Sequence, residues 1–210
     1  NTPGTWTLTG SERMRNRPIA ILVDALKSLG ANIEYLEKDG CPPMKIQGGQ
    51  LKGGKITIDG SVSSQYLSAL IMIAPSLTGG LEMELTGKIA SIPYLKMTLA
   101  LIAEFGAKYT FEGNIIRIEE GKYQGKEFTV EADWSAASYW YQIAALSDEA
   151  NITLKGLKEV SLQGDSAIVE MYKTFGVEST FNGTQVQLLK SNTNSADTFN
   201  YDFSDCPDVA

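Results

Sequence analysis

The chain contains no histidine and only two cysteines among its 210 residues. A segment without histidine holds no Ser-His-Asp triad, no Cys-His pair and no histidine-ligated metal. Cys41 and Cys206 are too few for a disulfide framework or a zinc site, and neither lies in a nucleophile motif. Proton transfer within this segment therefore falls to Asp, Glu, Lys or Tyr side chains.

Long apolar runs and excess positive charge are also lacking. The longest apolar run, Ala69 to Pro75, is far too short to span a bilayer. A net charge of −7 argues against a general nucleic-acid or anionic-membrane surface. A local site for a small anion stays open, because Arg13, Arg15 and Arg17 form a cationic cluster. We expect a cytoplasmic protein that binds neither nucleic acid nor membrane.

What the chain does contain is a repeated pattern. Three stretches run from a strand that ends in glycine, through a helix, to a second glycine about twenty residues later. They are Trp6 to Gly30, Leu81 to Gly106, and Asn151 to Gly176. Each closing glycine follows an amphipathic run and is typical of a left-handed helix cap. Further strands are predicted directly after these glycines.

The second and third copies begin with an additional strand and helix. These are predicted at 55–58 and 63–74, and at 128–130 and 135–146. The first copy lacks both elements, and Phe199–Asp202 predicts the opening strand of a fourth copy that does not continue. We therefore predict an α/β fold of repeated βαβαββ units, incomplete at both ends and belonging to a longer protein, with a boundary between Glu131 and Ala132.

Chemistry is predicted where the helices begin. Ser63, Ser64 and Gln65 lie between a strand and an apolar-periodic helix. Free N–H groups and the positive end of the helix dipole favour a phosphate or carboxylate there. Local physics alone favours a plainer role for Ser63 as an N-cap. Two hydroxyls and an amide in succession are nevertheless more than a cap requires.

Other predicted helix starts also have polar residues. Ser91 precedes Pro93 and Tyr94, and Pro93 suits a first helical turn. Arg17-Pro18 is predicted to open a helix, where a cation opposes the dipole unless an anion lies beside it. A solvated arginine is an equally good interpretation. Asp133 and Asp208 lie at strand-to-helix junctions and are either caps or functional groups.

At these positions the sequence resembles the 5-enolpyruvylshikimate-3-phosphate synthase family. The matching segments run in order along the whole chain: Thr9-Gly10, Arg13-Met14, Arg17-Pro18-Ile19, Asp59 to Leu67, Ser91, Pro93-Tyr94, Asp133, Ser135 to Tyr139, Gln163-Gly164-Asp165 and Pro207-Asp208. The Ser-Val-Ser-Ser-Gln segment at 61–65 is highly specific to this family within the enolpyruvyl transferases.

The resemblance implies a fold and an activity. The fold is the inverse α/β barrel-like arrangement of two domains, with residues 1–131 the later part of the first and 132–210 the beginning of the second. The activity is transfer of the enolpyruvyl group of phosphoenolpyruvate to the 5-hydroxyl of shikimate 3-phosphate, and it needs no metal or organic cofactor.

The resemblance also implies roles for individual residues. Ser63, Ser64 and Ser91 would bind shikimate 3-phosphate, and Gln65 would touch both substrates. Arg17 would pair with phosphoenolpyruvate. Asp208 would contact the 5-hydroxyl of shikimate 3-phosphate and is the candidate catalytic proton acceptor, while Tyr94 and Asp133 match positions near the cleft.

Several substrate contacts of the family have no counterpart in these 210 residues. We therefore expect the segment to be inactive without the remainder of its parent chain. Two alternatives stay open: the related transferase that acts on UDP-N-acetylglucosamine, and a noncatalytic anion-binding module of the same fold. The Ser-Ser-Gln motif argues against the first alternative.

Overall fold

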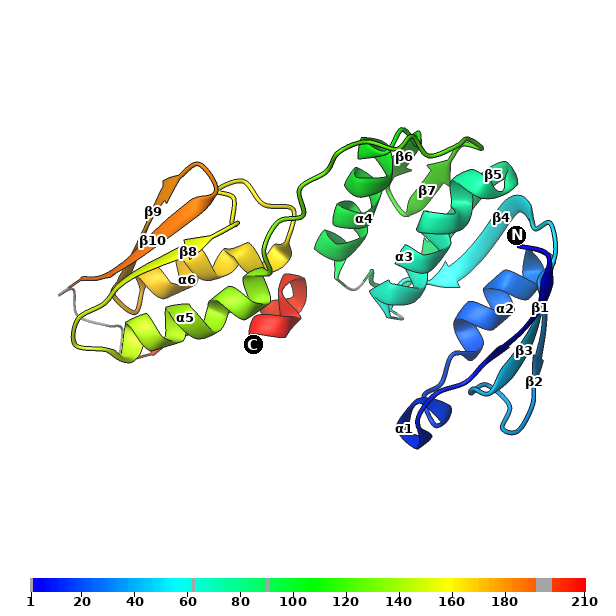
Figure 1. The fold of residues 1–210 in the computed structure, drawn as a ribbon, viewed down its shortest axis with the longest axis horizontal. Coiled ribbons are helices and arrows are strands. Elements are labelled where there is room, and N and C mark those ends of the chain that lie inside the picture. Colours follow the sequence, from blue (N-terminus) through cyan, green and yellow to red (C-terminus); the bar gives the residue numbers. More distant parts are fainter. Residues whose placement is uncertain (1, 62, 90, 192–197) are drawn as a thin grey trace. The chain divides into compact units, whose positions relative to one another are not determined.

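The computed structural model describes residues 2–61, 63–89, 91–191 and 198–210. The chain forms two compact units, shown in Figure 1: Asn1–Ala90 with Thr98–Lys126, and Ser91–Met97 with Glu127–Ala210. Within the described ranges, no helix has the length and apolar character needed to cross a membrane.

The first unit begins with a three-stranded antiparallel sheet. Strand β3 (Met44–Gly48) lies between β1 (Gly4–Leu8) and β2 (Asn32–Tyr35). The short helix α1 (Glu12–Arg15) and the helix α2 (Ala20–Ser28) connect β1 to β2. The apolar face of α2 packs on the sheet, because Val23 joins Ile33 and Met44 in a buried cluster.

The complete repeat follows, and most of it lies in the same unit. It consists of β4 (Lys52–Asp59), α3 (Ser64–Ile73), a short η1 turn (Ala74–Ser76), β5 (Thr78–Thr86), α4 (Ile92–Glu104), β6 (Tyr109–Glu112) and β7 (Ile115–Ile118). The strand order is β4-β5-β7-β6, with β4 parallel to β5 and the other pairs antiparallel. Residues of α4 up to Met97 group with the second unit. The predicted strand-helix-strand-helix-strand-strand pattern is confirmed here.

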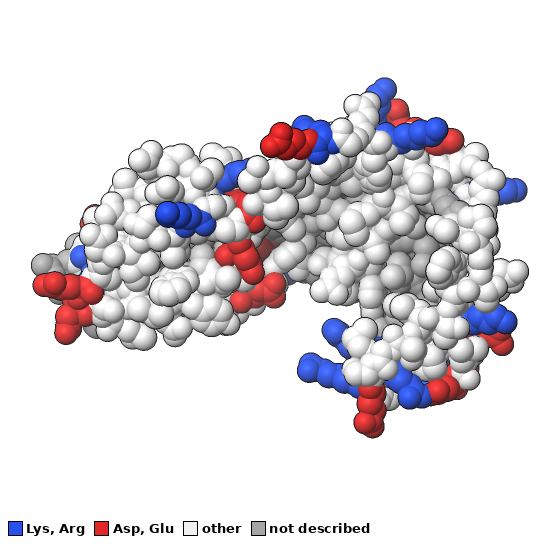
Figure 2. Space-filling view, in the orientation of Figure 1, with Lys and Arg blue, Asp and Glu red and all other residues white. Residues whose placement is uncertain are grey.

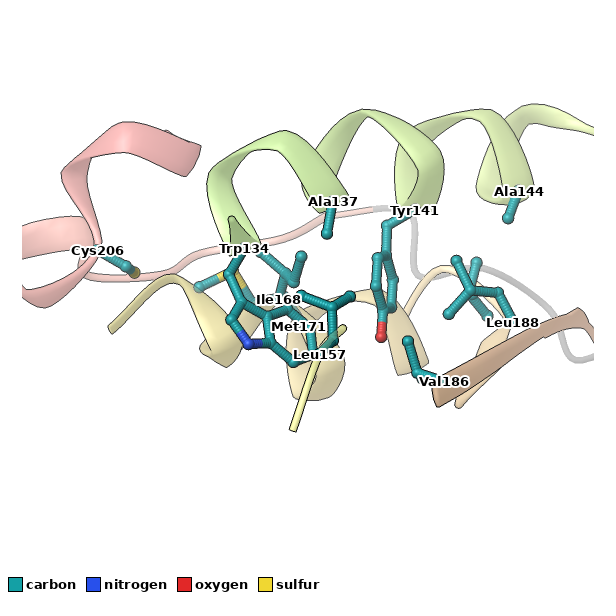
Figure 3. Packing of buried hydrophobic residues seen from close by; sticks show 11 residues of the cluster. Trp134, Ala137, Tyr141, Ala144, Leu157, Ile168, Met171, Val186, Leu188 and Cys206 are labelled. Atoms are coloured by element: carbon teal, nitrogen blue, oxygen red, sulfur yellow. The ribbon is translucent and has the colours of Figure 1, made fainter. Parts of the chain in front are cut away.

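The second unit contains an antiparallel sheet, the helices α5 and α6, and the first residues of α4. Its elements are α5 (Trp134–Leu146), β8 (Asn151–Lys155), the η2 turn (Gly164–Ala167), α6 (Ile168–Lys173), β9 (Val177–Asn182), β10 (Gln185–Lys190), and the turns η3 (Phe203–Asp205) and η4 (Pro207–Val209). The strand order is β8-β10-β9. Figure 3 shows Trp134 and Tyr141 reaching from α5 into the core of this unit, toward Leu157, Met171 and Val186.

The predicted helix-closing glycines are confirmed. Gly30 and Gly106 have φ of 92° and Gly176 has φ of 74°. These are left-handed backbone conformations, in which a side chain would collide with the following carbonyl group. Glycine at these three positions therefore ends each helix and turns the chain into the next strand.

Two predicted strands are wrong. Residues 128–130 and 199–202 form no strand, and Val130 is 79% exposed. A strand requires a hydrogen-bonding neighbour, which a run of β-formers cannot supply by itself. Phe199 and Tyr201 instead stack their rings, in a line of aromatic contacts that runs from Phe175 to Phe203. The third repeat consequently lacks its opening strand.

Candidate functional site

The first helix start lies at Ser63. Helix α3 begins at Ser64, and the Ser63 hydroxyl accepts a hydrogen bond from the Gln65 backbone N–H at 3.3 Å. The plainer cap role is therefore confirmed for Ser63. Ser64 is half-buried and Gln65 is exposed, so that both polar side chains stand at the open end of the helix. Val62, which belongs to the predicted motif, lies outside the described residues.

A hydrogen bond links this helix start to the segment that holds Arg17. The Tyr66 hydroxyl, in the first turn of α3, donates to the backbone carbonyl of Pro18. The sequence gives no local signal for this contact, because Tyr66 and Pro18 are 48 residues apart. The bond places the residue next to Arg17 against the start of the helix that carries Ser64 and Gln65.

Arg17 itself lies outside helix α2. The helix begins at Ala20 and Ile19 is its N-cap residue, so the prediction that Arg17-Pro18 opens this helix is wrong. Ile19 cannot cap with its side chain, and its backbone N–H instead donates to the carbonyl of Gly40 at 2.8 Å. The Arg17 side chain is exposed and forms no ion pair with a described residue, while the Arg17 backbone N–H donates to the Met14 carbonyl at 3.1 Å. Arg15, by contrast, pairs with Glu37, whose hydrogen bond and charge raise the pKa of Arg15.

The second helix start holds Ser91 and Tyr94 and belongs to the second unit. Ser91 has φ of 54°, and among the described residues it is the one non-glycine with positive φ. Such a conformation costs free energy for a residue with a side chain. Its carbonyl accepts the Tyr94 backbone N–H at 3.1 Å, which closes the first turn of α4.

Tyr94 and Asp208 form a direct pair in this unit. The Tyr94 hydroxyl donates to Oδ2 of Asp208 at 3.0 Å. Burial first, and then the hydrogen bond to Asp208, raises the pKa of Tyr94 well above its usual value. The tyrosine therefore stays protonated as a donor, and it leaves the second Asp208 oxygen for another partner. The two residues are far apart in the sequence, so no local pattern could have predicted their pairing.

A further group of polar residues gathers at the start of α5. Asp133 caps this helix by accepting the Ser135 backbone N–H at 2.9 Å. The Ser135 hydroxyl donates to Oδ2 of Asp165. Asp165 is only 4% exposed, and burial, with added repulsion from Asp208 and Asp133, raises its pKa. Asp165 occurred in the sequence only as part of Gln163-Gly164-Asp165, with no role assigned.

The six predicted site residues thus fall into two groups. Arg17, Ser63, Ser64 and Gln65 belong to the first unit, whereas Ser91 and Asp208 belong to the second. The first group offers donors and a cation, which suit an anion. Figure 2 shows basic side chains over α1 of the first unit and acidic ones over the end of the second unit where α5 starts. Across the described ranges, no cluster of acidic or sulfur side chains has the arrangement of a metal site.

Comparison with known proteins gives a consistent result over the whole chain. The family model described as EPSP synthase (3-phosphoshikimate 1-carboxyvinyltransferase) matches residues 1–210. The 3-phosphoshikimate 1-carboxyvinyltransferase of Bacteroides fragilis is 50% identical over 211 residues, which cover 100% of this chain and 51% of that protein. The one from Sulfurovum sp. is 40% identical over 99% of this chain and 48% of its own length.

A solved structure shows the same fold. EPSP synthase from Acinetobacter baumannii superposes with a TM-score of 0.68 at 22% identity, covering 91% of this chain and 44% of that one. The chain therefore spans about half the length of the curated relatives it matches. Its mixed α/β fold corresponds to part of that larger structure.

Proposed function

The chain belongs to the EPSP synthase (3-phosphoshikimate 1-carboxyvinyltransferase) family, and from this premise we propose that it is about half of an enolpyruvyl transferase. The whole enzyme moves the enolpyruvyl group of phosphoenolpyruvate onto the 5-hydroxyl of shikimate 3-phosphate and releases phosphate. The reaction uses no metal or organic cofactor. The 210 residues supply part of the substrate contacts and are inactive by themselves.

The observation that best supports this proposal is the hydrogen bond from Tyr66 to Pro18. It joins the start of α3 to the segment of Arg17. The N–H groups of the helix start and the guanidinium of Arg17 therefore belong to adjoining segments. Phosphate and carboxylate groups favour this combination of donors. We assign Ser63 and Ser64 to shikimate 3-phosphate, Arg17 to phosphoenolpyruvate, and Gln65 to both substrates.

In the second unit, Asp208 is the proposed proton acceptor for the 5-hydroxyl, and Ser91 is a further contact for shikimate 3-phosphate. The Tyr94 hydroxyl holds one oxygen of Asp208 at 3.0 Å, which limits rotation of the carboxylate. A general base acts efficiently only when it is held within hydrogen-bonding reach of the proton it accepts. Tyr94 therefore orients the carboxylate for this step.

We further propose that the repeats form the two-domain inverse α/β barrel-like fold of the family. Residues 1–131 belong to its first domain and residues 132–210 begin its second. The complete β4 to β7 repeat, with its parallel β4-β5 pair, is the observation that supports this arrangement.

The test compares the chain alone with a completed enzyme, in which it is joined to the flanking segments of the Bacteroides fragilis relative. We expect phosphate release from phosphoenolpyruvate and shikimate 3-phosphate by the completed enzyme and none by the 210-residue chain. Transition-state stabilisation needs the whole set of charged contacts, and the chain has only part of it. Turnover by the purified chain would contradict its proposed inactivity.

The same assay separates the two alternatives. A completed enzyme that turns over UDP-N-acetylglucosamine in place of shikimate 3-phosphate would identify the related transferase. One that binds shikimate 3-phosphate without any turnover, while the intact Bacteroides fragilis relative is active, would identify a noncatalytic anion-binding module.

A further inference from the structure

Asp165 is a buried carboxylate to which the proposed reaction gives no role. It is 4% exposed, and one of its oxygens accepts the Ser135 hydroxyl. The other oxygen, Oδ1, is buried and has no hydrogen-bond partner among the described residues. A charged oxygen left buried without a partner costs folding free energy. Such a group in a native fold therefore calls for an explanation.

The turn that holds Asp165 packs closely against the segment of Asp208. A side-chain carbon at Gly164 would lie 2.4 Å from the Asp205 carbonyl oxygen and 3.1 Å from Cβ of Pro93. Only glycine permits this approach. The η2 turn is thereby fixed against both the residues that precede Asp208 and the first turn of α4, which carries Tyr94.

The groups that face Asp165 come from every element around it. Asp133 at the start of α5 and Asp208 in η4 both repel its negative charge and, after burial, raise its pKa. Tyr94 in α4 and Cys206 between η3 and η4 respond to the Asp165 charge in turn, since it adds to the effect of burial in raising the pKa of each. Ser135 is the one group that opposes the effect on Asp165, and no cation is among the described groups that act on it.

We propose that Asp165 is a positioning residue that works through Asp208: its packed turn fixes the position of the Asp208 carboxylate, and its charge favours transfer of a proton to that carboxylate. This inference rests on the proposed function. Two carboxylates close together resist being ionised at the same time. When the 5-hydroxyl oxygen gives its proton to Asp208, that carboxylate becomes neutral and the repulsion ends. The electron pair of the broken O–H bond stays on the substrate oxygen, which then attacks phosphoenolpyruvate.

The first test measures stability on the 210-residue chain. Because its pKa is raised in the folded state, Asp165 stabilises the fold only at low pH. That contribution is lost as pH rises from about 4, the ordinary Asp value, through the raised pKa. Asp165→Asn removes the charge and keeps the shape, so we expect its unfolding midpoint at pH 7.5 to rise by about 2 °C or more. The gain should vanish near pH 3.

The matched control is Asp148→Asn, which removes the same charge from an exposed position of the same unit. Its midpoint should stay within about 1 °C of the unmodified chain, because surface substitutions have small effects. A fall in the midpoint of Asp165→Asn at pH 7.5 would show that Asp165 stabilises the fold, and the inference would be overturned.

The second test measures turnover by the completed enzyme against pH. Asp165→Asn should lower turnover about 10-fold or more and change the acidic limb of the profile, because one of two mutually repelling carboxylates is removed. Michaelis constants should change less than about 3-fold, because the proposed role gives Asp165 no contact with substrate. Ser135→Ala keeps the α5 cap but removes the hydrogen bond that lowers the pKa of Asp165. The acidic limb of the Ser135→Ala profile should therefore move to higher pH.

The two tests separate this inference from the proposed function. If the completed enzyme without substitutions is inactive, the proposed function fails, while the stability result on the chain still decides whether Asp165 is a costly buried charge. If that enzyme is active and Asp165→Asn leaves both turnover and the acidic limb unchanged, the positioning role is refuted. Loss of turnover together with a lower unfolding midpoint would mark Asp165 as structural only.

Discussion

At the scale of single residues, the two serines at the start of α3 differ in what they do for the fold. Ser63 caps the helix through the Gln65 N–H, whereas Ser64 makes no such bond. We expect Ser63→Ala to lower the free energy of unfolding by about 1 kcal/mol, the usual value for a lost cap. Ser64→Ala should leave stability unchanged within about 0.5 kcal/mol. Urea unfolding of both variants checks this.

The same pair tests substrate binding in the completed enzyme. Ser64→Ala should weaken binding of shikimate 3-phosphate by ~2 kcal/mol, because hydrogen bonds to a charged group are strong. Calorimetric titration measures that affinity. An unchanged affinity, with stability also unchanged, would remove Ser64 from the site.

Arg17 offers a test of shape separated from charge. Arg17→Lys keeps the cation but loses the planar fork that pairs with phosphate or carboxylate. We expect at least a ~10-fold rise in the Michaelis constant for phosphoenolpyruvate in the completed enzyme, with no change in unfolding midpoint. Arg15→Lys is the matched control, because Arg15 is engaged with Glu37. Equal effects of the two variants would show that Arg17 is only a solvated arginine.

Asp208 and Tyr94 can be distinguished by their kinetics. Asp208→Asn removes the proposed proton acceptor, and turnover should fall ~100-fold or more while substrate binding changes little. Tyr94→Phe removes the hydroxyl that donates to Asp208 at 3.0 Å and leaves the carboxylate in place, so turnover should fall less. Steady-state assays of the completed enzyme measure both. If Asp208→Asn keeps near-normal turnover, the proton acceptor is another residue.

At the scale of elements, one amide side chain bridges two backbone groups at the start of α5. Gln163 accepts the Trp134 backbone N–H at 2.9 Å and donates to the Ala132 carbonyl at 2.8 Å. Gln163→Ala leaves both groups unpaired, and we expect a loss of about 2 kcal/mol in unfolding free energy. Gln187→Ala is the control, because the Gln187 amide donates to the exposed Asn151 side chain. Thermal unfolding followed by circular dichroism compares them, and equal losses would contradict the bridging role.

An element can be predicted from sequence when the residues that cause it are close together in the chain. Gly30, Gly106 and Gly176 were predictable as helix ends, because a left-handed residue selects glycine without reference to anything distant. The strands at 128–130 and 199–202 were not, because pairing depends on partners elsewhere. Among site residues, the Ser63 cap follows from three consecutive positions. The Tyr94–Asp208 and Ser135–Asp165 contacts depend on the tertiary fold and could not be foreseen.

At the scale of the whole molecule, the two units have separate spectroscopic signals. Trp134 is completely buried in the core of the second unit, whereas Trp6 and Trp140 are about half exposed. The shift of tryptophan emission on unfolding therefore reports mainly the second unit. Leu70 is fully buried in α3 of the first unit, and Leu70→Ala should cost about 3 kcal/mol.

We expect Leu70→Ala to lower the midpoint of the circular-dichroism transition that belongs to the first unit. The midpoint of the tryptophan-emission transition should stay unchanged. The core that surrounds Trp134 consists of residues of the second unit. Met171→Ala, in that core, should have the opposite pattern. If both variants moved both transitions equally, the units would unfold together.

The outer edge of β1 has a practical consequence for anyone who handles this chain. All five residues of β1 are exposed, including Trp6 and Leu8, and β1 lies at the edge of its sheet. Unpaired main-chain groups beside apolar side chains promote self-association. Repulsion from the net charge of −7 opposes this at low ionic strength and fades as salt is added. The protein should therefore remain monomeric longest in dilute, low-salt buffer. Aggregation, measured by light scattering, should begin first in concentrated protein solutions of high ionic strength.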